Sequence, residues 1–178
     1  MKLNLSRRKL LSSSVIVAMS QITSKAFADT QADESATNTS DARIDDFTYE
    51  VTRTEAEWKE RLTNNEFRVM RKGATERRKS SPLWQETRAG IYSCKGCDLP
   101  VYDSQYKVIL DKGWTFFKHC EDNSVLTKID FIRGLGGVKT ATEAHCRRCG
   151  SHLGHIYYIE GQVLHCINGT SLIFAPAV

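Results

Sequence analysis

Four of the six cysteines form two matched pairs, Cys94–Cys97 and Cys146–Cys149, and each pair has two residues between its thiols. A Cys-x-x-Cys turn places two sulfurs where both can ligand the same ion. Two such turns, separated by a domain-sized stretch of chain, supply the four thiolates that structural zinc prefers. We therefore predict one structural Zn2+ held by these four cysteines. Two disulfides or a redox-active dithiol are the alternatives.

Cys166 stands apart from these pairs in the run LHCINGTSL, shortly after the histidine-bearing run SHLGHIYY. A thiol near two imidazoles indicates a reactive centre, because the thiolate is nucleophilic and imidazole exchanges protons near neutral pH. His152 and His155 are three residues apart, so a regular strand would not point both the same way, whereas a turn or bulge could. The alternative for Cys166 is a small buried hydrophobic residue.

A helical segment is expected before these motifs. Residues 54–57, Thr-Glu-Ala-Glu, form a capping box, and large apolar residues recur at helical spacing from Trp58 to Met70. Gly73 is a natural stop. The polar run 63–65 marks a break in this helix.

The chain from residue 89 onward consists of short runs of β-branched and aromatic residues separated by glycine-rich turns. The runs are GIYSC, LPVYDS, GWTFF, KTATEAHC, LGHIYYI, QVLHCI and SLIFA. They predict a mainly β fold of antiparallel strands with an N-terminal helical segment. The cysteine pairs fall at the ends or turns of these runs, so the zinc would join two hairpins far from a substrate cleft.

The first 28 residues have the three parts of an export signal. A twin-arginine pattern, SRRKLL, is followed by the apolar stretch SSSVIVAM and by Ala26-Phe27-Ala28, which suits a signal peptidase. The apolar stretch is far shorter than the about 20 residues that span a bilayer, so no permanent membrane anchor is expected. We predict a twin-arginine signal peptide over 1–28 and a periplasmic or otherwise extracytoplasmic location. This route carries folded proteins, which suits a chain that binds zinc before it meets oxidants.

Residues 29–46 are rich in Thr, Ser, Asp and Ala, which predicts a flexible linker, and residues 47–178 form one domain of ordinary size. The segment 1–28 holds five of the 25 basic residues and none of the 21 acidic ones. The remaining chain therefore carries 20 basic residues against 21 acidic residues. This near-neutral balance lacks the footprint of a nucleic-acid binder, so no nucleic-acid partner is expected.

Several runs together resemble the methionine-R-sulfoxide reductases: TERRKSSPLWQETRAGIYSCKGCDLPVYDS, Gly113-Trp114, EAHCRRCGSHLGHIYY and HCINGTSLIFAP. The resemblance extends from about residue 49 to 177, and SHLGH followed closely by CIN is specific to that family. It implies two small antiparallel sheets and a zinc held by the two cysteine pairs. It also implies a catalytic thiol with active-site partners and an aromatic substrate pocket, at Cys166, His152, His155 and Asn168, and at Trp114 and its neighbour Phe117. A core role for Trp114 and a turn role for Asn168 are the alternatives.

The chemistry of these residues agrees with the implied activity. Sulfoxide reduction requires a soft nucleophile that attacks sulfur while the oxygen accepts a proton. The thiol of Cys166 needs a lowered pKa, from donors such as Asn168 or from positive charge. Trp114 can hold the S-methyl group by a sulfur–aromatic contact. The reaction leaves a sulfenic acid on Cys166, which a second thiol reduces through a disulfide.

The chain departs from the family pattern around the site. Leu164 stands two residues before the nucleophile, where the family usually has an arginine. The acidic loop that normally follows the histidine motif is shortened to residues 159–162, and the expected GWPSF is GWTFF. Loss of one charged donor can lower a rate by about 10²–10³. A slower or differently selective enzyme is therefore consistent with the sequence. His165 or Lys118 could offset the missing charge.

Cys120 is the one thiol left after the metal site and the nucleophile are assigned. The family commonly places a resolving cysteine just before the GW pair, where this chain has Lys112. We hypothesise that Cys120 forms the recycling disulfide with Cys166, the alternative being a buried bystander.

The sequence thus predicts an exported enzyme that reduces the R epimer of methionine sulfoxide in oxidised proteins or peptides. Its partners would be a thioredoxin-like or other thiol reductant in addition to the oxidised substrate. The alternative is a non-catalytic zinc-ribbon-like module that uses the same scaffold for binding. The reactivity of Cys166 discriminates the two, because a binding module does not need a reactive thiol.

Overall fold

The computed structural model describes residues 47–134 and 137–178. The predicted signal segment 1–28 and linker 29–46 lie outside the described residues. Within the described ranges, no helix is both long and apolar enough to cross a membrane.

Two short helices, α1 (Glu55–Arg61) and α2 (Asn64–Lys72), form the predicted helical segment, and the break between them falls where the sequence indicates. Each helix begins with a complete capping box, in which Thr54 or Thr63 accepts a hydrogen bond from the backbone three residues on. Helix α2 ends at Gly73, whose φ of 66° is the left-handed conformation that glycine adopts freely.

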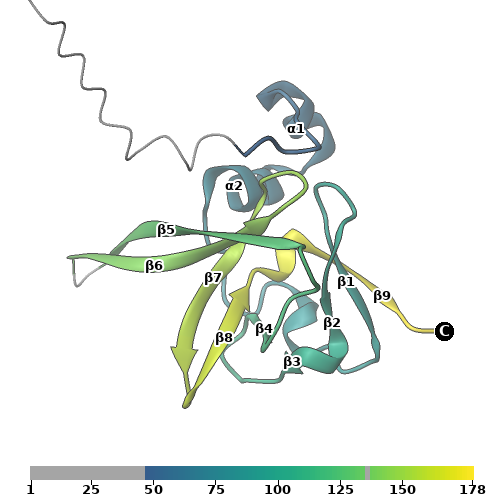
Figure 1. The fold of residues 1–178 in the computed structure, drawn as a ribbon, viewed down its shortest axis with the longest axis vertical. Helices are drawn as coiled ribbons and strands as arrows, with labels where there is room; N and C mark the ends of the chain where they lie inside the picture. Colours follow the sequence, from purple (N-terminus) through teal and green to yellow (C-terminus); the bar gives the residue numbers. More distant parts are fainter. Residues whose placement is uncertain (1–46, 135–136) are drawn as a thin grey trace, which may run out of the picture. The chain divides into compact units, whose positions relative to one another are not determined.

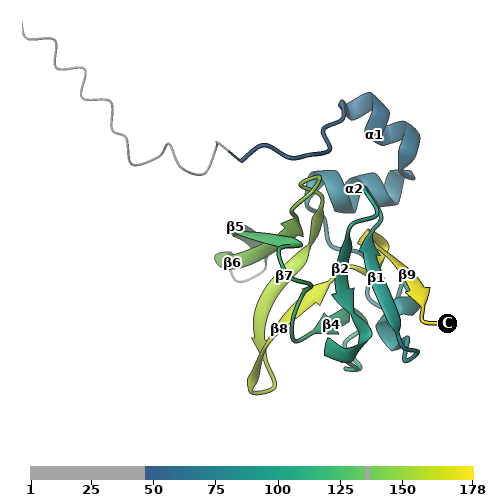
Figure 2. The same ribbon diagram turned by 45° about the vertical axis from the view of Figure 1, so that its right-hand side comes forward.

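The strands form two antiparallel sheets, as predicted (Figures 1 and 2). The three-stranded sheet has the order β2-β1-β9, and the six-stranded sheet has the order β3-β4-β8-β7-β6-β5. Their bounds are β1 (Gly90–Cys94), β2 (Pro100–Asp103), β3 (Lys107–Val108), β4 (Thr115–Phe117), β5 (Val125–Gly134), β6 (Gly137–Cys146), β7 (His152–Ile159), β8 (Gln162–Ile167) and β9 (Leu172–Pro176).

The core lies where the two sheets and the helices meet. Phe117 of β4 stacks on Tyr102 of β2 with ring centroids 4.3 Å apart, and it meets Tyr92 of β1 edge to face at 5.0 Å. Trp58 and Met70 bring the helices onto the same cluster, and all five side chains are buried. These contacts bury one face of β4 and β8 in the core. The opposite face of the same strands, which carries Phe116 and Cys166, does not pack into this cluster.

The long hairpin of β5 and β6 is only half expected from the sequence. The apolar runs predict β6, whereas β5 is not among them, although its residues 128–131 alternate polar and apolar side chains. In Figures 1 and 2 this hairpin extends away from the three-stranded sheet. Its neighbour in the sheet is β7, the strand that carries the two histidines.

Candidate active site and metal site

The four paired cysteines come together as one cluster between the two sheets. Cys94 ends β1 and Cys146 ends β6, and the second cysteine of each pair lies on the turn that follows. The Sγ atoms of Cys94 and Cys149 are 3.7 Å apart, those of Cys97 and Cys146 are 3.5 Å apart, and all four lie within 4.8 Å of one another. Tetrahedral zinc with Zn–S bonds of about 2.3 Å separates its sulfurs by about 3.8 Å, whereas a disulfide needs about 2.05 Å.

The electrostatics of the cluster are consistent with a bound cation. Hydrogen bonds from Cys146 and then Cys149 raise the pKa of the Cys94 thiol, while contacts with Cys146 and its neighbours lower the pKa of Cys149. Four buried thiols at this spacing cannot all ionise together unless a positive ion lies between them. The donor set fits the predicted structural zinc, which ties the β1–β2 turn to the β6–β7 turn.

The two histidines reach the same face of the sheet because β7 is irregular at its start. The pairing of β6 with β7 shifts between Ala144 and His145, so that Ala144 lies opposite Gly154 and His145 lies opposite His152. Leu153 is the additional residue of this β-bulge. The rings of His152 and His155 consequently pack edge to face with centroids 5.1 Å apart. The bulge expected from the three-residue spacing is therefore present.

Cys166 of β8 is the direct cross-strand neighbour of His155 on one side and of Phe116 of β4 on the other. Side chains of such neighbours share one face of the sheet. Gly154 allows the strands to approach closely, because a Cβ there would lie 2.1 Å from the carbonyl oxygen of Cys166. The sheet register therefore brings the thiol and one imidazole together.

A cavity of about 180 Å³ lies over this pair, and its walls include most of the predicted site residues. It is lined by Thr75, Trp114, Gly154, His155, Tyr157, Cys166 and Asn168. Its volume is below the roughly 300–1,000 Å³ of pockets for drug-sized ligands, so it suits one amino-acid side chain. His152 does not line this cavity, although its ring packs against His155, and its buried Nε2 has no partner among the described residues.

The electrostatics at Cys166 differ from the sequence-based expectation. Burial, with a smaller contribution from the Glu76 carboxylate, raises the pKa of the Cys166 thiol to about 12. The prediction of a lowered pKa is therefore wrong for the free protein, because the surrounding walls exclude water and no cationic side chain of the described residues offsets this burial. The resting site holds a neutral thiol.

Glu76 organises the wall opposite the sheet, and the sequence motifs do not reveal it. Its buried carboxylate accepts hydrogen bonds from the backbone N–H groups of Gly169 and Thr170, both at 2.8 Å, and from Thr170 Oγ1 at 2.6 Å. Its own N–H donates to Asn168 Oδ1 at 3.0 Å, and its carbonyl accepts from Trp114 Nε1 at 3.4 Å. A buried carboxylate with this many donors fixes the loop after β8 and the indole that walls the cavity.

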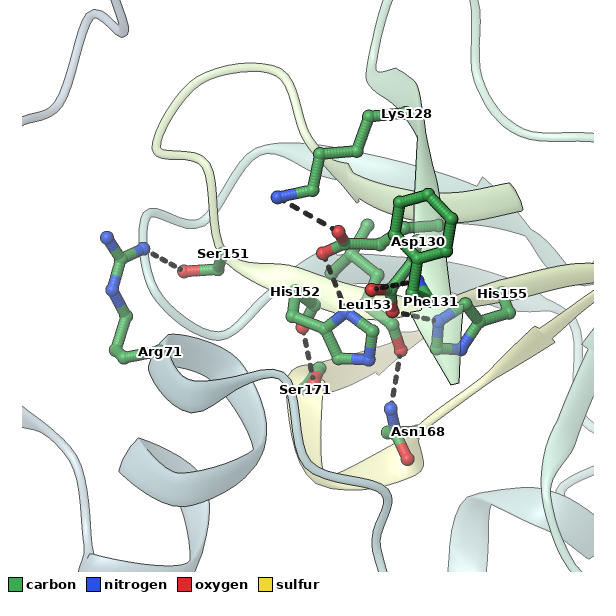
Figure 3. Close-up of polar contacts among 11 residues, drawn as sticks. Arg71, Lys128, Asp130, Phe131, Ser151, His152, Leu153, His155, Asn168 and Ser171 are labelled. Carbon is green, nitrogen blue, oxygen red and sulfur yellow. Dashed lines mark hydrogen bonds and ion pairs between the residues drawn. The ribbon is translucent and has the colours of Figure 1, made fainter. Parts of the chain in front are cut away.

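Asn168 is buried, and its amide links three segments of chain. Its Oδ1 accepts from Glu76, and its Nδ2 donates to the carbonyl of Leu153, the bulge residue, at 3.0 Å. Asn168 thus holds the histidine bulge against the loop that follows the nucleophile. Figure 3 shows it beneath the two imidazoles.

Two acidic residues of the β5–β6 hairpin contact the histidines, and no sequence motif singles out either of them. His152 Nδ1 donates to Glu143 Oε1 at 2.8 Å, and His155 Nε2 donates to Asp130 Oδ2 at 2.9 Å (Figure 3). Burial opposes ionisation of Glu143, but hydrogen bonds from His152 and Lys128 outweigh it and hold its pKa at about 2. The hydrogen bond from His155 likewise lowers the pKa of Asp130.

Two predicted site residues lie elsewhere. Phe117 belongs to the core described above and does not line the cavity, whereas Phe116 shares the face of Cys166. Cys120 packs against the core cluster that contains Tyr102 and Phe117, on the other side of β4 and β8 from the cavity. Burial raises the pKa of its thiol. The structure therefore does not bring Cys120 to Cys166.

The charge expected in place of the family arginine does not come from the residues suggested by the sequence. Leu164 is fully buried opposite Tyr157 on the cavity side. His165 points to the core side, where its Nδ1 lies 3.0 Å from the hydroxyl of Tyr102, and burial lowers its pKa to about 4. Lys118 is exposed beyond the end of β4. The charged side chains near the site are instead Glu76 at the cavity wall and, on the hairpin, Lys128, Asp130 and Glu143.

A thiol beside an imidazole in a small aromatic cavity, on a β domain held together by four metal-binding cysteines, defines a zinc-containing thiol enzyme. Residues 62–176 match the family described as the SelR domain. A peptide methionine sulfoxide reductase MsrB of Agrobacterium fabrum is 34% identical over 131 residues, covering 71% of this chain and 93% of the relative. One of Methylibium petroleiphilum is 37% identical over 139 residues, covering 74% and 96%. The chain belongs to the SelR family.

Among solved structures, the crystal structure of the Mis18 'Yippee-like' domain is similar with a TM-score of 0.45 and 22% identity, covering 51% of this chain and 99% of that chain. The family assignment does not depend on this similarity.

Removal of one zinc ligand is expected to abolish folding of the domain. In Cys149→Ser three thiolates remain, and structural zinc contributes about 10–16 kcal/mol in small domains, as much as the about 5–15 kcal/mol of a whole fold. Zinc content by atomic absorption should fall from one per domain, and the cooperative thermal transition should vanish. Cys120→Ser is the matched control and should keep both. A zinc-free wild-type domain whose mass shows two disulfides would contradict the site.

Alkylation of Cys166 should report its raised pKa. Because the thiolate reacts and burial favours the thiol, the iodoacetamide rate in Cys120→Ser should still increase above pH 9. A cysteine peptide should instead level off near its ordinary pKa of about 8.5. The double variant Cys120→Ser/Cys166→Ser gives the background from the zinc ligands. A plateau below pH 8 for the folded domain would show an activated thiolate and contradict a neutral resting thiol.

Proposed function

We propose that this chain is a peptide-methionine (R)-S-oxide reductase, which uses a thiol to reduce the R epimer of methionine sulfoxide in proteins. The observation that carries this proposal is the cross-strand pairing of Cys166 with His155 in a cavity walled by Trp114 and Tyr157. The cavity accepts one side chain and offers an apolar aromatic wall, a nucleophilic sulfur and a proton-bearing ring. Nothing in the described residues favours the non-catalytic binding module.

The reaction transfers one oxygen atom between two sulfurs. The sulfur of Cys166 attacks the sulfoxide sulfur, and the sulfoxide oxygen accepts a proton from the neighbouring imidazole. The S–O bond of the substrate then breaks, and the oxygen ends on Cys166 as a sulfenic acid. The substrate sulfur gains two electrons and becomes a thioether, and the cysteine sulfur loses two. The thiol proton replaces the one that the imidazole gave up.

The neutral resting thiol fits this sequence of events. Burial favours the protonated thiol of Cys166 until a sulfoxide, a strong hydrogen-bond acceptor, enters the cavity and accepts a proton. Trp114 and Tyr157 provide the faces against which the S-methyl group packs. The thiol and the bound sulfoxide are then already oriented for attack, so the reaction does not depend on a chance encounter in solution.

Recycling is proposed to use an external thiol that reacts directly with Cys166. The first external thiol displaces water from the sulfenic acid and forms a mixed disulfide, and a second thiol releases Cys166. The position of Cys120 on the core side of the sheet supports this route over an internal disulfide in the described conformation. A thioredoxin-like dithiol supplies both thiols from one molecule and is the proposed physiological donor.

Export is the remaining part of the proposal. The twin-arginine pattern around Arg7 and Arg8, the short apolar stretch and the Ala-Phe-Ala sequence at 26–28 support a cleaved signal and an extracytoplasmic location. A thiolate-bound zinc is best loaded before exposure to oxidants, which also supports transport in the folded state.

The reductase activity is tested with the zinc-bound domain from residue 47 onward and separate R and S epimers of a methionine-sulfoxide peptide. With excess dithiothreitol, only the R epimer should be reduced, and Cys166→Ser should lower the rate at least a thousandfold because it removes the nucleophile. Cys120→Ser, the matched thiol control, should turn over at the wild-type rate if recycling is direct. No reduction of either epimer by a folded, zinc-loaded domain would refute the function.

Export is tested by fractionating bacterial cells that express the full chain. Arg7→Lys/Arg8→Lys keeps the charge but removes the paired guanidinium groups, so the protein should stay in the cytoplasm at its full mass. The wild-type protein should be extracytoplasmic and shortened by about 28 residues, the length of the expected signal. Equal export of both forms would exclude the twin-arginine route.

A further inference from the structure

The β5–β6 hairpin supplies each active-site imidazole with its own carboxylate. Asp130 lies 2.9 Å from His155 Nε2, and Glu143 lies 2.8 Å from His152 Nδ1. His155 is held through Nε2 and His152 through Nδ1, so each ring keeps its other nitrogen for a different hydrogen bond. Figure 3 shows both contacts on the hairpin side of the rings.

The sheet register also places Glu143 and His155 side by side in one cross-strand row. Lys128 of β5 pairs with Glu143 of β6, Glu143 pairs with His155 of β7, and His155 pairs with Cys166 of β8. The ammonium of Lys128 lies 3.0 Å from Glu143 Oε2, while Oε1 receives the His152 hydrogen bond. A cation, a carboxylate, an imidazole and the thiol therefore follow one another across four neighbouring strands.

Asp130 is held as firmly as Glu143 although it is more exposed. Its Oδ1 accepts from the backbone N–H of Phe131 at 2.8 Å, which leaves Oδ2 directed at His155. The side chain of Asp130 is 38% exposed and that of Glu143 is 9% exposed. Asp130 is therefore the residue that can be altered without burying an unpaired group.

The two carboxylates matter because the residues of β8 next to Cys166 supply no charged partner for the imidazole. Leu164, the residue of β8 that shares the cavity side with Cys166, is apolar, and His165 is engaged with Tyr102 on the core side. An imidazole that must give a proton to a sulfoxide has to be held in one orientation and stabilised when positively charged. A carboxylate hydrogen-bonded to the ring does both.

We propose that Asp130 is a positioning residue for His155, and that Glu143, itself held by Lys128, has the same role for His152. The inference rests on the proposed reductase function, and it assigns to the hairpin the charge that orients and supports the proton donor. Neither carboxylate lines the cavity, so both act through the imidazoles and not on the substrate.

The groups that can influence this pH dependence come from several elements. They are Lys128 and Asp130 of β5, Glu143 of β6, His152, His155 and Tyr157 of β7, Cys166 of β8, Glu76 at the cavity wall, and Arg71 and Lys72 of α2 around a second, polar cavity next to His152. Tyr157 also packs against His155, with ring centroids 5.8 Å apart, but it lines the cavity. Asp130 combines a hydrogen bond to His155 and partial exposure with a position outside the cavity, and this makes its effect on the imidazole separable from contacts with the substrate.

The test compares the zinc-loaded wild-type domain with Asp130→Asn, Asp130→Glu and the charge-matched control Asp122→Asn, whose side chain is exposed in the turn before β5. Single-turnover formation of the thioether is followed from pH 5 to 10. Asp130→Asn should lower the maximal rate on the order of tenfold to a hundredfold, with KM little changed. The pH above which the rate declines should be lower in Asp130→Asn, because the cationic ring of His155 loses its carboxylate partner. Asp130→Glu should recover part of the rate, and Asp122→Asn should match the wild type.

A second readout separates this inference from the reductase proposal. In imidazole NMR spectra the Nε2–H proton of His155 should give a protected, hydrogen-bonded signal that is lost in Asp130→Ala, which removes the acceptor, and kept in Asp122→Asn. If the wild type shows that signal but reduces neither epimer, the reductase proposal fails and the Asp130–His155 contact stands. An active Asp130→Asn with an unchanged rate and pH profile overturns the positioning role.

Discussion

The zinc-binding cluster controls where the reactive strands begin. Its two turns belong to different sheets, one after β1 and the other between β6 and β7, so the metal holds the sheets together at one end. Cys149 precedes His152 by only three residues, and the bulge at Leu153 follows at once. The later register of β7 with β8 is set by their two-residue turn, in which Glu160 and Gly161 have positive φ and Ile159 pairs with Gln162. This register pairs His155 with Cys166. The metal site and the β7–β8 turn together therefore set the positions of the reactive side chains.

Burial at the site disfavours charge on Cys166, and the structure places the charged side chains around the thiol and not against it. This burial raises the pKa of the Cys166 thiol, which favours the neutral form and protects the thiol but removes its intrinsic activation. Ionised groups are placed one layer further out, where Glu76, Asp130 and Glu143 each receive several hydrogen bonds. Buried carboxylates are tolerated there because donors replace the lost water. The imidazoles can therefore transfer protons although no charged side chain lies directly against the Cys166 sulfur.

Local sequence signals predicted much of the architecture. The two capping threonines and Gly73 define the helices, and seven short apolar runs correspond to strands, because turns and side-chain alternation depend on neighbouring residues. Strand β5 contains no apolar run, and its alternation of polar and apolar residues covers only residues 128–131, which is too short to distinguish a strand from a loop. Its polar side faces the histidines and its apolar side, with Ile129 and Phe131, is exposed. Such a strand becomes recognisable only from its partners.

The sequence by itself determined the residue types of the chemistry: two cysteine pairs at metal-binding spacing, a separate thiol and two nearby imidazoles. These follow from spacing along the chain, which needs no knowledge of distant contacts. The tertiary structure decided which of two adjacent phenylalanines belongs to the core, on which side of the sheet Cys120 lies, and which carboxylates reach the rings. Those outcomes depend on strand register, since a shift of one residue moves every side chain to the opposite face. Outside the tight β7–β8 hairpin, register also depends on pairing between segments far apart in the sequence, such as Gly90 of β1 with Pro176 of β9, and no local pattern encodes that pairing.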